Sequence, residues 1–156
     1  MNILILGITS WVGVCLSREL QKHGFSITGT TRGNPHFSLC DSAAMEVCRS
    51  PVDYLSLVDE GDFSVVINLL RGEETSNFLV HKSVIKICSE KDVLYCYASS
   101  ALALDGYPFD TLLTEQLHAK SNSDYGIFKA LCEEEIQKEK NLRSLILRFS
   151  SIQGWP

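Results

Sequence analysis

Residues Met1–Gly13, MNILILGITSWVG, decide the fold of this chain. Ile3–Leu6 is an unbroken apolar run that ends at Gly7, a pattern typical of a strand buried on both faces of a parallel sheet. Gly7, Ser10 and Gly13 follow at intervals of three residues and predict a tight turn into a helix. The backbone N–H groups and the positive helix end at such a turn bind the diphosphate of a dinucleotide. We therefore expect a cofactor site lined by Gly7, Thr9, Ser10, Trp11, Val12 and Gly13.

The three spaced residues have different expected roles in this turn. Gly7 permits the backbone to turn, and Gly13 lets the helix pack closely on the strand. The middle position, usually glycine, is Ser10. Its hydroxyl either donates to a phosphate or crowds it, and both interpretations remain open.

Length and charge limit the class of protein. The 156 residues suffice for one core, so we predict a single dinucleotide-binding domain over residues 1–156. The net charge of -5, without a basic cluster, argues against nucleic-acid binding. No apolar run reaches the length of a membrane span, so we predict no membrane association. Met1 leads directly into the first strand without a signal peptide, so we expect a cytoplasmic protein.

The six cysteines and four histidines indicate neither disulfides nor a metal site. No two cysteines form a C-x-x-C pair, and several lie in apolar stretches, such as Cys96 in VLYCYA. We interpret them as reduced residues of the core. The histidines are scattered along the chain, so we predict no metal site.

Apolar runs and helical periodicities alternate along the chain. The predicted strands are Ile3–Leu6, Phe25–Thr30, Phe37–Asp41, Val65–Leu70, Val93–Ala98 and Ser144–Phe149. The predicted helices extend from Gly13 to about His23, over Ser42–Cys48, from Asn77 to about Glu90 and over Ser123–Glu139. Pro51–Phe63 is predicted to be an exposed connection and Ala101–Asn122 a long irregular loop. This alternation predicts an α/β fold with a doubly wound parallel sheet and right-handed crossovers.

The segment Ser123–Glu139 is the clearest amphipathic helix. Its predicted apolar stripe consists of Tyr125, Phe128, Leu131, Cys132 and Ile136. The charged residues expected largely on its other faces are Glu133, Glu134, Glu135 and Lys138.

Arg32 bears on the choice between NAD and NADP. An acidic residue after the second strand would accept from the 2′-hydroxyl of the adenosine ribose and favour NAD, but the chain has Thr30, Thr31 and Arg32 there. Arg32 could instead pair with a 2′-phosphate, which predicts NADP as the cofactor and makes NAD the less favoured one. The alternative is a solvated arginine at a strand end.

Two further polar residues are candidates for cofactor contacts. Asp41 either caps the helix that follows it, which we favour, or contacts the adenine amino group. Asn68 lies in a buried strand and needs partners, either the neighbouring backbone or the cofactor.

Ser100, Tyr125 and Lys129 are the candidate catalytic residues. Tyr125 and Lys129 are four residues apart on the predicted helix and therefore share a face. An ammonium group close to a phenol favours the ionised phenol, which would make Tyr125 a proton donor near neutral pH. Lys129 could also hold the hydroxyls of the nicotinamide ribose. Ser100 lies at the carboxyl end of a strand, where open α/β sheets bind ligands, and could orient a substrate carbonyl.

The order of these motifs resembles the extended short-chain dehydrogenase/reductase superfamily. The matching elements are GITSWVG, Asn68, Ser99-Ser100 and the stretch YGIFK at residues 125–129, with Ser100 and Tyr125 separated by 25 residues. SSALALDG followed by YGIFK is similar to the dTDP-4-dehydrorhamnose reductase branch of the NAD-dependent epimerases and dehydratases. Asn77 matches a helix asparagine of those enzymes, and LRFSSIQGWP resembles the strand and turn that lead into their substrate domain.

The resemblance implies an NAD(P)-dependent oxidoreductase that acts on a nucleotide-activated sugar. Reductase, epimerase and dehydratase chemistry all fit the motifs. By the resemblance, Tyr125 protonates the sugar oxygen, Ser100 hydrogen-bonds it, and Lys129 tunes Tyr125. It also implies cofactor contacts after the strand at Leu69 and Leu70, where small residues are usual. By the resemblance, family members continue well beyond this length, so we expect the chain to lack most of the usual C-terminal substrate domain.

Two other functions remain open from the sequence. The chain could be a binding module without catalysis, as a regulatory subunit or a truncated remnant, and the bulk of Leu69 and Leu70 together with Ser10 favours that alternative. It could also be an α/β domain without a cofactor. Either a homodimer or a complex with a partner subunit is compatible with the resemblance.

Overall fold

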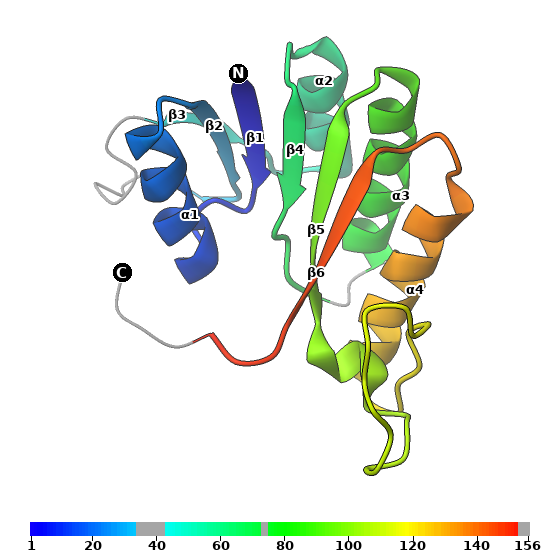
Figure 1. Ribbon diagram of the computed structural model, residues 1–156. Coiled ribbons are helices and arrows are strands. Elements are labelled where there is room, and N and C mark those ends of the chain that lie inside the picture. The colour runs from blue at the N-terminus through cyan, green and yellow to red at the C-terminus, as the bar shows by residue number, and fades with distance from the viewer. Residues whose placement is uncertain (34–42, 73–74, 153–156) are drawn as a thin grey trace.

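The computed structural model describes residues 1–33, 43–72 and 75–152, and its centre is a parallel sheet of six strands (Figure 1). The strands are β1 (Asn2–Leu6), β2 (Ser26–Thr31), β3 (Ala44–Val47), β4 (Val65–Asn68), β5 (Leu94–Ser100) and β6 (Ser144–Phe149). Their order is β3-β2-β1-β4-β5-β6. The order reverses between β1 and β4, and this is the position at which open α/β sheets bind ligands. The structure therefore confirms the doubly wound parallel sheet.

Four α-helices connect the strands and cover the two faces unequally. They are α1 (Trp11–Lys22), α2 (Pro51–Glu60), α3 (Thr75–Glu90) and α4 (Asp124–Lys138), and a short 3₁₀ helix, η1, spans Ala101–Leu104. α1 lies on one face, whereas α2, α3 and α4 lie on the other (Figure 1). Each face has its own apolar core, with Val14 of α1 on one side and Val58, Val84 and Ile136 on the other.

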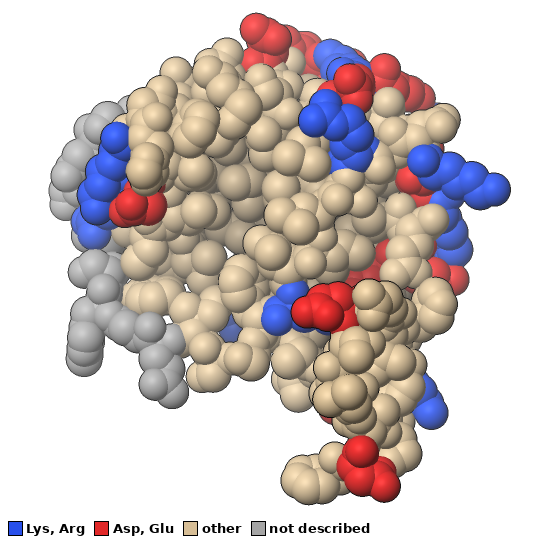
Figure 2. Space-filling model, in the orientation of Figure 1, with Lys and Arg blue, Asp and Glu red and all other residues tan. Residues whose placement is uncertain are grey.

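The α1 side of the sheet is thinly covered over β6. Leu145 and Leu147 are 48% and 40% exposed there, although both belong to a strand. Figure 2 shows that the middle of this face, over β5 and β6, is almost free of charged side chains. The apolar character of the sheet thus extends beyond the part that α1 covers.

Two predictions between β2 and β4 are wrong. Pro51–Phe63 is largely a helix, α2, because Ser50 caps it, Asp53 completes a capping box and Pro51 occupies its first position. Its Tyr54 and Val58 are buried. The segment predicted as a helix, Ser42–Cys48, contains β3, which pairs with β2. The strand predicted over Phe37–Asp41, together with Asp41 itself, lies outside the described residues.

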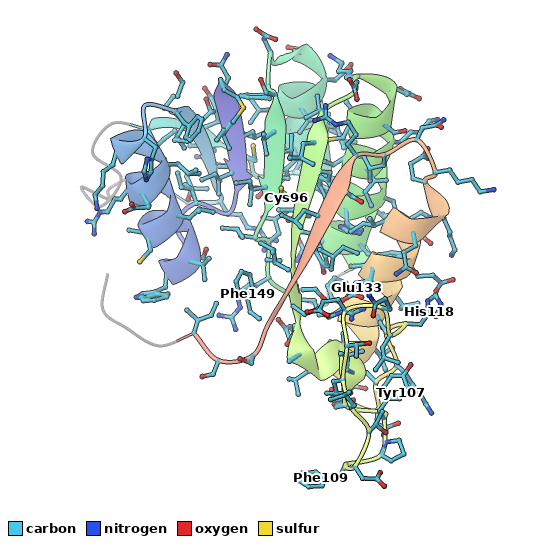
Figure 3. All side chains as sticks on the ribbon, viewed as in Figure 1. Cys96, Tyr107, Phe109, His118, Glu133 and Phe149 are labelled. Atoms are coloured by element: carbon cyan, nitrogen blue, oxygen red, sulfur yellow. The ribbon has the colours of Figure 1, made fainter. Side chains whose placement is uncertain are left out.

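The long connection between β5 and α4 begins with η1 and then projects from the carboxyl end of the sheet, with Phe109 at its tip (Figure 3). Asp105 ties its two ends together by accepting from Ser121 Oγ at 2.6 Å and from Ser123 Oγ at 2.8 Å. Ser123 then caps α4 by accepting from the N–H of Gly126. These bonds fix the first turn of α4, which carries Tyr125.

Within the described residues, no helix has the length and apolar character needed to cross a membrane. Cys15, Cys48, Cys88, Cys96 and Cys132 are free thiols, and all but Cys15 are buried. The described residues form no group of three or more potential metal ligands.

Candidate active site

The glycine-rich turn joins β1 to α1 at the carboxyl edge of the sheet. Gly7 takes a left-handed conformation with φ of +82°, which favours glycine, and its N–H donates to Thr30 Oγ1 at 3.0 Å. A Cβ on Gly13 would lie 2.4 Å from the backbone oxygen of Ile8. Only glycine therefore permits this close approach of α1 to the turn.

Ser10 is the N-cap of α1. Its Oγ accepts from the N–H of Gly13 at 3.1 Å. This bond occupies an acceptor of the hydroxyl, but its hydrogen can still be donated to a ligand. The serine thus performs a capping function that the usual glycine lacks.

Ser100, Tyr125 and Lys129 lie together around one cavity of about 640 Å³. The cavity is also lined by Ser10, Trp11 and Val12, so the structure brings the predicted catalytic residues and the glycine-rich turn to the same space. Phe149 extends from β6 toward α1 and lines it as well (Figure 3). β5 supplies Ser100 and α4 supplies the other two residues, so the cavity depends on how α4 packs against β5.

Lys129 is 3% exposed and is held by the backbone of β5. Its Nζ donates to the carbonyl oxygen of Ala98 at 2.7 Å. It lies 4.7 Å from the ring centre of Tyr97 and 5.6 Å from that of Tyr125. Burial is the main cause that lowers the pKa of Lys129 to about 8, and the charge of Arg71 lowers it further. The amine can therefore change its charge close to neutral pH.

A backbone hydrogen bond also holds the Ser100 side chain at the cavity. It is 8% exposed, and its Oγ accepts from the N–H of Leu102 at the start of η1, at 3.2 Å. The hydroxyl hydrogen remains for a group in the cavity.

A second cavity, of about 430 Å³, lies on the other side of the turn. Its described lining includes Gly7, Thr9, Ser10, Arg32, Leu69 and Leu70, together with Thr30, Thr31, Gly33, Tyr54 and Arg71. Arg32 Nη2 donates to Asn77 Oδ1 at 2.5 Å, so the guanidinium is anchored at the N-terminal turn of α3. No carboxylate occurs among the described residues that line this cavity.

Asn68 lines neither cavity. It is 2% exposed, its Oδ1 accepts from the N–H of Leu70 at 3.0 Å, and its Nδ2 donates to Tyr95 Oη at 2.7 Å. Tyr95 Oη in turn contacts His81 Nδ1, and His81 Nε2 contacts the carbonyl of Cys132, both at 2.9 Å. Of the two interpretations of Asn68, the structure supports partners within the protein.

Sequence analysis missed a buried ion pair close to the candidate catalytic residues. Glu133, expected on a charged face of α4, is fully buried, whereas Leu131 of the predicted apolar stripe is 46% exposed. Arg148 Nη2 lies 2.7 Å from Glu133 Oε2, and Ser99 Oγ donates to the same carboxylate. Figure 3 places Glu133 close to the lower end of the sheet. The four-residue spacing from Lys129 was a signal for this shared face.

Arg71 was also missed. It follows β4 by three residues and lines both cavities. Composition alone gave no signal for it, because the strand pattern ended at Leu70.

The comparisons with known proteins agree with this geometry. The model of the NAD dependent epimerase/dehydratase family matches residues 3–155. No protein in a search of curated sequences matches the chain.

Solved structures share the fold at low sequence identity. A UDP-glucose 4-epimerase superposes with a TM-score of 0.83 at 18% identity, over 100% of this chain and 53% of its own. A UDP-N-acetylglucosamine 4-epimerase from Bacillus cereus superposes with a TM-score of 0.80 at 20% identity, over 100% of this chain and 57% of its own. The UDP-glucose 4-epimerase of Thermus thermophilus, solved in complex with NAD, superposes with a TM-score of 0.79 at 16% identity, over 95% of this chain and 54% of its own. The chain thus spans about half the length of these structures.

Proposed function

Because the chain belongs to the NAD-dependent epimerase/dehydratase family, we propose that it forms the cofactor-binding and proton-transfer half of an enzyme acting on a nucleotide-activated sugar. One observation carries the proposal. Ser100, Tyr125 and Lys129 line the same cavity as the N-terminus of α1. An α/β domain without catalytic duty has no need of this combination.

The two cavities fit a nicotinamide dinucleotide. They share Ser10, Leu69 and Arg71, so they form two adjoining compartments. A dinucleotide consists of two nucleosides joined by a diphosphate, and the N-terminus of α1 lies at the junction. Ser100, Tyr125 and Lys129 would then face the nicotinamide, and Arg32 would face the adenosine.

The residues of the chain would act on the proton rather than on the hydride. When bound, the nicotinamide supplies hydride transfer to or from the sugar carbon. Tyr125 would give its phenolic proton to the carbonyl oxygen on reduction and take it back on oxidation. Ser100 would donate its free hydroxyl hydrogen to the same oxygen. Lys129 keeps two N–H groups besides the one on Ala98, which suits the ribose hydroxyls and Tyr125.

The test begins with the cofactor and then addresses the chemistry. We expect NADH or NADPH to bind to the chain with a measurable change in nicotinamide fluorescence, and failure of both to bind would refute the proposal. In a form of the protein that turns over a 4-keto nucleotide sugar, Tyr125→Phe should keep this binding but lower that turnover about 10²–10⁴-fold, as loss of a general acid does. Tyr107→Phe, in the projecting connection, is the matched control. Normal turnover in Tyr125→Phe would exclude it as the acid.

Arg32 supports a preference for NADP within this function. Its guanidinium lines the adenosine compartment and no described residue of that lining is acidic. Asn77 anchors one of its nitrogens. A contact with the 2′-phosphate would be worth roughly 1.5–3 kcal/mol. We expect NADPH to bind more tightly than NADH and Arg32→Ala to remove the difference. Equal affinities in the wild type would contradict the preference.

For residues 1–156 by themselves, a dinucleotide-binding module without turnover is the second candidate, because they match only about half the length of the solved epimerases. The solved epimerases carry almost as much chain again outside the matched part. Holding the sugar against the nicotinamide requires further walls around the cavity. We expect this chain alone to bind the cofactor but to turn over 4-keto nucleotide sugars more slowly than about 1 s⁻¹, the low end of the usual range. Faster turnover by the isolated chain would exclude the second candidate.

A further inference from the structure

Arg71 occupies the junction between the two compartments. Ser10, Leu69 and Arg71 line both compartments. Lys129 lines the first compartment but not the second, and Arg32 lines the second but not the first. Among the described residues, Arg71 is the basic residue that reaches both.

The backbone that carries Arg71 is fixed, while its side chain is exposed. Asn77 Nδ2 donates to the carbonyl oxygens of Arg71 and Gly72, at 3.0 and 3.3 Å. Gly72 follows with φ of +111°, and a Cβ there would lie 3.0 Å from the same nitrogen. Asn77 therefore positions Arg71 through its amide nitrogen and Arg32 through its amide oxygen.

We propose that Arg71 binds the diphosphate of the dinucleotide, opposite the N-terminus of α1. The proposal rests on the proposed function and adds a binding residue to it. The diphosphate is the anionic group that joins the two nucleosides, so a ligand that fills both compartments places it at their junction. A guanidinium can bind two phosphate oxygens with parallel hydrogen bonds. The backbone N–H groups at the start of α1 then hold the diphosphate from the other side.

This contact would also link cofactor binding to Lys129. The positive charge of Arg71 contributes, after burial, to the lowered pKa of Lys129. A diphosphate on Arg71 would neutralise that charge, and the pKa of Lys129 would rise. The amine would therefore be more fully protonated in the loaded protein, where its N–H groups are needed.

The test compares Arg71→Gln and Arg71→Lys with Arg143→Gln in fluorescence titrations of NADH and of NADPH. Arg143 precedes β6 and pairs with Asp92 far from both cavities, so its variant controls for the lost charge. We expect Arg71→Gln to weaken both cofactors equally, by roughly tenfold, because the diphosphate is common to them. Arg71→Lys should retain part of the affinity, and the salt dependence should be shallower in Arg71→Gln than in the wild type.

The outcomes separate this proposal from the function on which it rests. If the wild type binds neither cofactor, the proposed function fails. If the wild type binds and Arg71→Gln binds equally well, only the assignment of Arg71 fails. A UDP-glucose titration distinguishes the other source of a diphosphate. A loss confined to UDP-glucose would place Arg71 at the substrate and overturn the proposal.

Discussion

Replacing Glu133 by Gln tests the buried ion pair that joins β6 to α4, the helix that carries Tyr125 and Lys129. Glu133 is on α4, one turn after Lys129, and it is completely buried. Its carboxylate accepts hydrogen bonds from Arg148 Nε at 3.1 and 3.2 Å and from Arg148 Nη2 at 2.7 Å. It also accepts one from Ser99 Oγ. Gln keeps the shape and one acceptor, but its amide N–H₂ would face the guanidinium.

The expected loss in the free energy of unfolding is about 3 kcal/mol. Removing one partner of a buried pair typically destabilises by roughly 3–5 kcal/mol, because the other charge remains buried without compensation. We expect the lower end, since Arg148 is 16% exposed and its Nη2 also donates to the carbonyl oxygen of Leu117 at 2.9 Å. The bond from Arg148 to Leu117 joins β6 to the connection before α4. A shift of Arg148 in the variant should therefore also displace Tyr125, in the first turn of α4.

Urea unfolding followed by circular dichroism measures the effect, with Glu134→Gln as the control. Glu134 is the neighbour of Glu133 on α4, and its contact with Lys138 is mostly exposed, so its removal should change stability very little. The double variant Glu133→Leu/Arg148→Met removes both charges and should be more stable than Glu133→Gln. Equal unfolding midpoints for Glu133→Gln and Glu134→Gln would refute the reasoning.

Two further predictions concern buried polar groups. The pKa of Lys129 is about 8 in the fold and 10.5 ordinarily, so between these values the unfolded chain binds more protons, and stability should rise with pH relative to Lys129→Met. Urea midpoints of the two proteins at pH 7 and pH 10 check this, and parallel profiles would contradict it. Tyr95→Phe leaves Asn68 Nδ2 and His81 Nδ1 unsatisfied and should destabilise by about 1–3 kcal/mol. Tyr97→Phe is the control in the same denaturation assay and should destabilise less than Tyr95→Phe, since the buried Tyr97 hydroxyl makes no hydrogen bond to an oxygen or nitrogen atom of the described residues.

The sequence was sufficient where the information is local. The apolar run Ile3–Leu6 and the spacing of Gly7 and Gly13 together specify strand, turn and helix within thirteen residues. The four-residue spacing likewise placed Tyr125 and Lys129 on one face of α4, and the structure shows them around one cavity. In each case the physical cause lies within one or two turns of the chain.

The sequence was insufficient where the partner is distant or the pattern is diluted. Acidic residues made α2 look like an exposed connection, although Tyr54 and Val58 are spaced for a buried helix face. β3 is held by its pairing with β2, which outweighs the propensity of its own four residues. The burial of Glu133 depends on Arg148, which is fifteen residues away and belongs to another element.

The position of β1 has a consequence for the order in which the chain assembles during synthesis. β1 leaves the ribosome before the other five described strands, yet it lies inside the sheet between β2 and β4. One of its edges can pair as soon as β2 is complete, but the other stays open while residues 32–64 are made. At roughly 5–20 residues per second this interval lasts roughly 2–7 s. During that time the unpaired edge Ile3–Leu6 is a site for unwanted strand pairing. Once β4 closes it, β5 and β6 join the growing side in the order of their synthesis, and no completed strand has to move.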